Sequence, residues 1–168
     1  MEILLHWRTC LQRWGEPRVT QDVDLTLLTG FGNEDAYIRT VLQKFNARIE
    51  NADAFALRNR VLLLQSNTGI GIDIALGALD FEERAVQRAS FYEFLPETHL
   101  FTCSAEDLIV YKAFAARPRD WVDIEGILIR QHDAIDWNYV QEQLVPLVTL
   151  KEEPEILCQL EKLKKAHA

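Results

Sequence analysis

Three aspartates lie in apolar, strand-like stretches of this sequence. Asp22 and Asp24 occur in VTQDVDLTLL, residues 19–28, and Asp73 occurs in GIGIDIAL. Because side chains alternate along a strand, Asp22 and Asp24 are expected to point to the same face. Two like charges one pleat apart repel, so the pattern costs stability unless a positive group lies between them. One such aspartate is usually an edge-strand or hydrogen-bonded acid, but three together favour a site for a divalent cation.

The chemistry of such a site follows from its ligands. Mg²⁺ takes oxygen ligands, typically one or two carboxylates together with substrate phosphates. A D-x-D on one strand and a third acid on a neighbouring strand provide that set. Sites of this type hold two metals about 4 Å apart, which bind the attacking and leaving oxygens of a phosphoryl or nucleotidyl transfer. The sequence therefore predicts metal-dependent chemistry at a phosphate.

The elements that must position these acids are strands with an interposed helix, followed by a helical tail. A strand is predicted from Val23 to Leu28, a helix after Asn33, and short strands in FALRN, VLLLQS and GIGIDIAL. The remaining sequence is expected to be mostly helical. Its predicted helix starts are the capping boxes Asp80/Glu83 and Ser104/Asp107, then Pro118, Asp136 and Pro154. We expect a core domain over residues 1–103 and a helical extension, packed on it, over residues 104–168.

Composition excludes several classes of protein. The 168 residues suit one domain with a short appendage, and no apolar run approaches the roughly 18 residues that span a bilayer. Membrane association is therefore not expected, and MEILLHWRTC is too short for a secretory signal. Cys10, Cys103 and Cys158 form no C-x-x-C pair, which predicts buried free thiols in the cytoplasm. A net charge of −8 argues against broad attraction to nucleic acid.

The ordered motifs resemble a known family. The segment LQRWGEPRVTQDVDLTLL is similar to the first motif of the nucleotidyltransferase superfamily, in its minimal and AbiEii-type toxin branch. Asp73 in IDIAL matches the family's third acid. The segment YKAFAARPRDWVDIEGIL resembles its later helical motif, a lysine followed by R-x-[KR]-D-x-x-D. The resemblance covers about residues 10–150 and implies an α/β (α+β) nucleotidyltransferase fold, with a small mixed sheet, flanking helices and a C-terminal helical extension.

The resemblance also implies roles for individual residues. Asp22 and Asp24 would bind Mg²⁺, and Asp73 would complete the metal site and accept the proton of the attacking hydroxyl. Lys112 would contact the phosphates of the NTP, helped by Arg18. Four further residues would not contact the nucleotide directly but would support the side chains that bind it: Asp120, Asp123, Arg117 and Arg119.

The implied function is Mg²⁺-dependent transfer of an NMP from an NTP to a hydroxyl of RNA or protein. In AbiEii-type relatives this is toxin chemistry, which a separately encoded antitoxin neutralises. The sequence departs from the family at Trp7 and Arg8, which stand where a Gly-Gly or Gly-Ser pair normally lets backbone amides approach the triphosphate. A truncated or altered N-terminus is one explanation, and a nucleotide held differently is another. A lost N-terminal helix would expose an apolar face and favour a homodimer.

Two alternatives stay open. The first is a degenerate nucleotidyltransferase-fold binding protein without activity, which the bulky Trp7 at the phosphate position favours. The second is a metal-dependent nuclease, which also uses paired acids. Restriction-type nucleases usually carry (D/E)-x-K on the strand of the second acid, and IDIAL offers no lysine after Asp73. Binding of Mg²⁺ and NTP distinguishes an active transferase from the degenerate protein.

Overall fold

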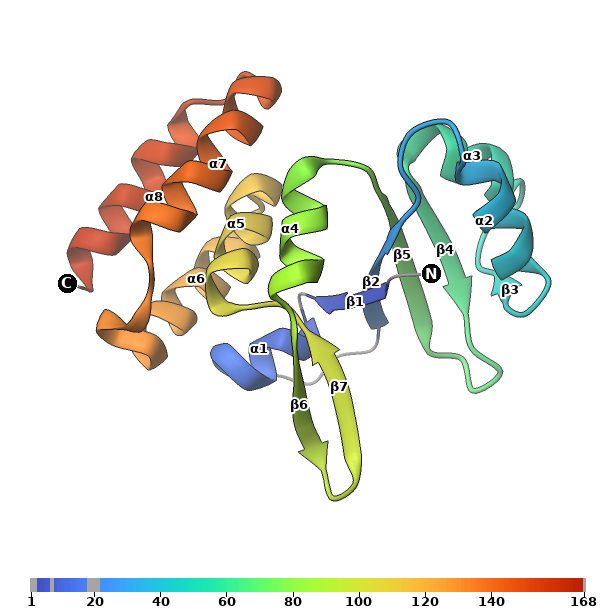
Figure 1. Ribbon diagram of the computed structural model, residues 1–168, viewed down its shortest axis with the longest axis horizontal. Helices are drawn as coiled ribbons and strands as arrows, with labels where there is room; N and C mark the ends of the chain where they lie inside the picture. The colour runs from blue at the N-terminus through green and yellow to red at the C-terminus, as the bar shows by residue number, and fades with distance from the viewer. Residues whose placement is uncertain (1–2, 7, 18–21, 168) are drawn as a thin grey trace. The chain divides into compact units, whose positions relative to one another are not determined.

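Two compact units, each assembled from segments distant in the sequence, make up the computed structural model (Figure 1). The structure describes residues 3–6, 8–17 and 22–167. The sheet unit consists of the described residues within 1–9 and 19–103. The helical unit consists of those within 10–18 and 104–168. Residues 10–17 therefore group with helices that lie about a hundred positions further along the chain.

A mixed seven-stranded sheet forms the centre of the sheet unit, in the order β3-β4-β5-β2-β1-β7-β6. The pairs β2–β5 and β1–β7 are parallel, and the other pairs are antiparallel. The strands are β1 (Ile3–His6), β2 (Asp22–Leu28), β3 (Asn46–Ala47), β4 (Val61–Gln65), β5 (Gly71–Gly77), β6 (Ser90–Leu95) and β7 (Thr98–Thr102). Its helices are α2 (Glu34–Leu42), α3 (Ala52–Asn59) and α4 (Asp80–Arg88).

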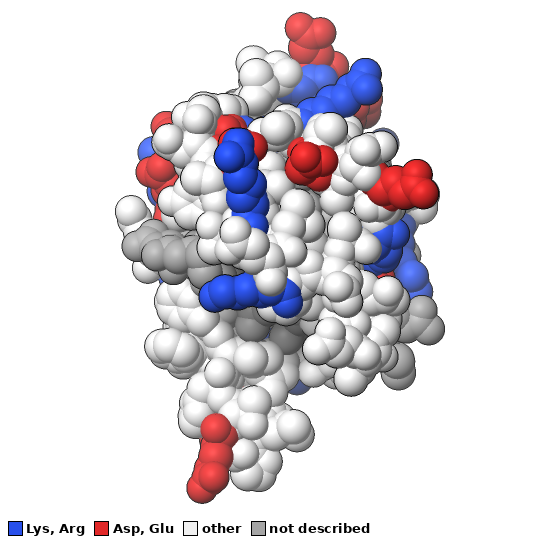
Figure 2. All heavy atoms as spheres, turned by 90° about the vertical axis from the view of Figure 1, so that its right-hand side faces the viewer, with Lys and Arg blue, Asp and Glu red and all other residues white. Residues whose placement is uncertain are grey.

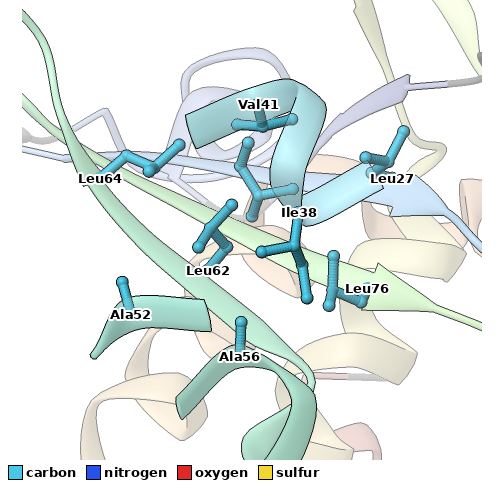
Figure 3. Close-up of a cluster of buried hydrophobic side chains, with 9 residues drawn as sticks. Leu27, Ile38, Val41, Ala52, Ala56, Leu62, Leu64 and Leu76 are labelled. Atoms are coloured by element: carbon cyan, nitrogen blue, oxygen red, sulfur yellow. The ribbon is translucent and has the colours of Figure 1, made fainter. Parts of the chain in front are cut away.

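Helices α2 and α3 cover one face of this sheet through a cluster of buried apolar side chains. As Figure 3 shows, Ile38 and Val41 from α2 lie in one cluster with strand residues such as Leu62 and Leu76, and α3 adds small alanines. Leu62 is fully buried, and burying a leucine stabilises a fold by roughly 1.5–3 kcal/mol. The full cluster is Leu27, Ile38, Val41, Ala52, Ala56, Leu62, Leu64, Ile74 and Leu76. Because strand side chains alternate, the intervening residues of β2 and β5 point to the opposite face.

The helical unit has its own core, around the buried helix α5 (Ala105–Ala115). The other elements of the unit are most of α1 (Arg8–Trp14), α6 (Pro118–Gln131), the 3₁₀ turn η1 (His132–Ala134), α7 (Trp137–Lys151) and α8 (Glu155–Ala166). Ser104 caps α5 by accepting the Asp107 N–H at 3.1 Å, and Asp136 caps α7 through the amides of its first turn. The predicted starts at Ser104, Pro118 and Asp136 are confirmed.

The chain thus has a mixed α/β fold with helices flanking the sheet and further helices at its C-terminal end. The predicted strand in FALRN is wrong, because these residues lie in α3, where Ala52 and Ala56 are spaced four apart and buried together. The helix start at residue 80 is confirmed, but the acid that turns back on it is Glu82 and not Glu83. Glu82 accepts the N–H groups of Ala78 and Leu79 at 2.8 and 3.0 Å.

Three further expectations need correction. Residues 90–102 form the β6–β7 hairpin within the stretch expected to be mostly helical, and β1 was not predicted at all. The side chains of Cys10 and Cys103 are buried as expected, whereas that of Cys158 is exposed on α8. Every helix in the described part of the chain is too short or too polar to traverse a bilayer.

Candidate functional site

The three strand aspartates come together on one face of the sheet. In the parallel pair β2–β5, Asp24 is opposite Asp73 and Asp22 is opposite Gly71. Residues that are opposite on neighbouring strands share a face and lie about 5 Å apart. Leu27 and Leu76 alternate with the acids and enter the core under α2 and α3. The three carboxylates therefore lie on the face opposite α2 and α3, which we call the acid face.

A guanidinium lies between two of these carboxylates. Arg48 donates a hydrogen bond from Nη2 to Oδ1 of Asp73 at 2.6 Å, and its Nη1 lies 3.6 Å from Oδ1 of Asp22. The three side chains are each about one-third exposed, at 33%, 31% and 32%. A side chain of this protein thus supplies positive charge on this face. The sequence predicted a cation between Asp22 and Asp24, whereas Arg48, which the sequence analysis missed, contacts Asp22 and Asp73.

Strand order explains how Arg48 reaches the acid face. The residue directly follows β3, and its backbone N–H continues the ladder by donating to the Leu63 carbonyl at 3.0 Å. Leu63 on β4 is itself opposite Asp73 on β5. The arginine lies 25 positions before Asp73 in the sequence. No local spacing connects the two residues, so only the pairing of β3, β4 and β5 brings them together.

Gly71 makes room for this contact. A β-carbon at Gly71 would overlap both the carboxylate of Asp22 and the guanidinium of Arg48. The close approach of these two charged groups therefore depends on the absence of a side chain at that position. Gly71, the second glycine of GIGID, thus serves the packing of these side chains.

The donor set of the acid face fits a hard divalent cation. Carboxylate oxygens are the ligands that Mg²⁺ prefers, and the two strands place three carboxylate groups on one face. Among the described residues, no group of three or more aspartate, glutamate, histidine or cysteine side chains is arranged so that it could hold a metal ion as it stands. The chemistry of the ligands thus suits the metal, while the guanidinium of Arg48 holds two of the carboxylates.

A second charged cluster lies within the helical unit. Lys112 on α5 is 1% exposed, and its Nζ lies 2.6 Å from Oδ2 of Asp123 and 3.4 Å from Oδ1 of Asp120. Arg117 donates to Asp120 from its backbone N–H at 3.2 Å and from Nε at 2.7 Å. We call these four residues the Lys112 cluster. Arg119 is exposed on the first turn of α6.

The helix start brings the Lys112 cluster together. Pro118 opens α6, and Asp120 turns back to bond the N–H of Arg117, the residue that precedes the helix. Asp120 and Asp123 lie one turn apart on the same side of α6, which is the spacing that lets both contact one lysine.

Two other residues named in the sequence analysis, Arg18 and Trp7, lie outside the residues that the structure describes. Arg8 begins α1.

Comparison with protein families decides the assignment. Residues 9–142 match the family model described as nucleotidyl transferase AbiEii toxin, type IV TA system. The chain belongs to the AbiEii nucleotidyltransferase toxin family. The AbiEii match contains the acid face, Arg48 and the Lys112 cluster, and it begins after Trp7 and Arg8.

Other comparisons add less. No curated protein gives a significant match. Among solved structures, the chain is similar to an antigenic nucleotidyltransferase-like protein from Paracoccidioides brasiliensis. The two are 14% identical with a TM-score of 0.47, and the match covers 95% of this chain and 84% of that one.

Proposed function

We propose that this AbiEii family member transfers an NMP from an NTP to a hydroxyl group of RNA or protein, using a divalent metal at the acid face. The observation that carries the proposal is the register of β2 and β5, which aligns Asp24 with Asp73 and leaves Asp22 on the same face. Membership of a nucleotidyltransferase toxin family supports the reaction class. NTPs and Mg²⁺ are both available in the cytoplasm, where we place the reaction.

The proposed reaction assigns a task to each acid. Asp22, Asp24 and Asp73 would hold Mg²⁺. When bound, this ion would neutralise part of the negative charge of the triphosphate. Asp73 would also accept the proton of the attacking hydroxyl. The hydroxyl oxygen forms a bond to the α-phosphorus, the bond from that phosphorus to the β-phosphate oxygen breaks, and pyrophosphate leaves. The acids would thus bind the metal and accept the hydroxyl proton, and the NMP would become covalently attached to the RNA or protein acceptor.

The basic residues would bind the nucleotide. We propose that Lys112 and Arg18 contact its phosphates, with Asp120 and Asp123 fixing the position of the Lys112 ammonium. The ion pairs at 2.6 and 3.4 Å support a positioning role for these two acids. Arg117 is held by Asp120, and the exposed Arg119 would add positive charge at the start of α6.

The choice of acceptor depends on surface charge. The net charge is −8, and on the face drawn in Figure 2 basic side chains are scattered singly among acidic ones. Broad electrostatic attraction to RNA is not supported, so an RNA acceptor would have to be held by a local basic site. A separately encoded antitoxin is the proposed partner, in keeping with the type IV toxin–antitoxin description of the family.

Transfer of labelled nucleotide tests the proposal. The protein is incubated with Mg²⁺, each of the four NTPs, and either total RNA or a protein extract, with the label on the α-phosphate or the γ-phosphate in parallel. We expect the α-label to enter the acceptor and the γ-label to leave as pyrophosphate. The Asp22→Asn/Asp24→Asn variant should abolish transfer, whereas Asp53→Asn, at an exposed position on α3, should retain it. Wild-type transfer by the double variant would show that the assignment of these acids is wrong.

A binding protein without activity is the second candidate. Trp7 and Arg8 replace the family's glycine pair, and the contacts of Arg48 give Asp22 and Asp73 a positive partner without metal. Isothermal titration with each NTP and Mg²⁺ separates the two candidates. Metal-dependent binding that the double variant loses supports the transferase, and the lack of binding to any NTP supports the second candidate.

A further inference from the structure

The guanidinium of Arg48 and a divalent cation require the same carboxylates. Arg48 contacts Oδ1 of Asp73 at 2.6 Å and approaches Oδ1 of Asp22 to 3.6 Å. A metal held by these acids would bind the same two carboxylate groups. The guanidinium and a divalent cation compete there because two positive groups at the same carboxylates repel each other, and the hydrogen bond of Arg48 already uses one acceptor site of Asp73.

Arg48 is held beside the acid face but is able to leave it. Its backbone N–H is fixed to the Leu63 carbonyl at 3.0 Å, so the side chain starts from a defined place. Its side chain is one-third exposed, and β3, which precedes it, has only two residues, both exposed. A long side chain with an exposed end can turn away into water without moving the sheet.

We propose that Arg48 is the resident counter-ion of the acid face and competes with the divalent metal for Asp22 and Asp73. The inference rests on the proposed function, because it takes the acid face to be the metal site. In the metal-free protein Arg48 offsets the repulsion between the carboxylates. Binding of the metal breaks the Arg48–Asp73 contact, so the metal affinity of the wild-type protein is lower than the three acids alone would provide.

Direct titration with Mn²⁺, followed by electron paramagnetic resonance of the free ion, measures this competition without any need for activity. We expect Arg48→Gln to bind Mn²⁺ at least about ten-fold more tightly than wild type. Arg58→Gln is the matched control, since it makes the same substitution at an exposed position on α3, and its affinity should equal that of wild type. Arg48→Lys keeps the positive charge but loses the planar guanidinium. Its Mn²⁺ affinity should therefore lie between those of wild type and Arg48→Gln.

Introducing Asp24→Asn into the wild-type and Arg48→Gln proteins tests whether Mn²⁺ binds at the acid face. Loss of Mn²⁺ binding in both backgrounds, together with tighter binding by Arg48→Gln, supports the inference. Equal affinity of wild type, Arg48→Gln and Arg48→Lys overturns it and leaves the proposed metal site intact. Lack of Mn²⁺ binding by every one of these proteins overturns both the inference and the proposed metal site. If Arg48→Gln does not fold, the comparison of Arg48→Lys with wild type decides the question alone.

Discussion

At the scale of single residues, Arg60 and Glu34 show how a charged pair fixes the loop that follows β2. Arg60 forms an ion pair with Glu34 and donates from Nη2 to the carbonyls of Leu76 and Gly30, at 2.6 and 3.1 Å. Its guanidinium also lies 4.7 Å from the ring centre of Phe31. The backbone N–H of Glu34 and the Arg60 side chain lower the pKa of Glu34 below its ordinary value of 4.5.

This lowered pKa predicts a pH dependence of stability. A carboxyl group with a lower pKa in the folded state stabilises the fold above its unfolded pKa, and the contribution is lost as the pH falls through the folded pKa. The difference in free energy of unfolding between wild type and Glu34→Gln should therefore be largest above about pH 4.5 and shrink in more acid solution. Urea denaturation over a pH series measures it. A Glu34→Gln difference that stays constant over the pH series would contradict the prediction.

At the scale of elements, the Lys112 cluster links α5 to α6. Lys112 lies on α5, whereas Asp120 and Asp123 lie on α6, and all three side chains are buried. Taking charges out of water is costly, and only their mutual contacts compensate. The pair of helices is therefore specified by charge as well as by apolar packing. Breaking the contact would leave two carboxylates buried without the ammonium.

The prediction at this scale is a large loss of stability in Lys112→Met. Removing one partner of a buried ion pair costs about 3–5 kcal/mol, and urea denaturation should detect that decrease. Lys44→Met, which changes an exposed lysine after α2, should alter stability by much less than 1 kcal/mol. Unfolding free energies of the two variants that agree within error would show that the Lys112 cluster contributes little to the fold.

At the scale of the whole molecule, both units combine segments from distant parts of the chain. In the helical unit, residues 10–17 pack on α6. Arg130 donates to the carbonyl of Gly15 at 2.6 Å, and Gln131 donates to that of Trp14 at 2.9 Å. A β-carbon on Gly15 would lie only 3.0 Å from Leu11 and 3.1 Å from Ile127. Residues 10–17 are therefore part of the helical unit, despite their place in the sequence.

Arg130→Met tests this long-range link. Loss of the hydrogen bond to Gly15 should reduce stability by about 1 kcal/mol. More specifically, the amide hydrogens of residues 10–15 should exchange faster with solvent, because local opening becomes easier. Hydrogen–deuterium exchange measures the effect. Arg119→Met, an exposed change on the same helix, should leave this segment protected, and equal exchange in both variants would contradict the link.

Much of the fold could be predicted because its signals are local. Alternation along a strand follows from backbone geometry, so the shared face of Asp22 and Asp24 required only their spacing. The caps at Ser104 and Asp136 also depend on contacts within one turn of helix. Short stretches whose helix and strand propensities are similar were harder to predict, as the helix formed by FALRN shows. There the burial of Ala52 and Ala56 under the sheet decides the outcome.

Local patterns in the sequence were enough to predict the acids, the face that they share, most helix starts and the family motifs. The groups that contact the acids depend instead on how distant segments pair. The order β3-β4-β5-β2 brings Arg48 to Asp73 and Asp22, and the packing of α5 and α6 gives Lys112 its two carboxylates. The physical reason is the range of the interactions. Backbone geometry fixes neighbours within a few residues, whereas contacts between distant segments depend on which arrangement buries the most apolar surface and pairs the buried charges.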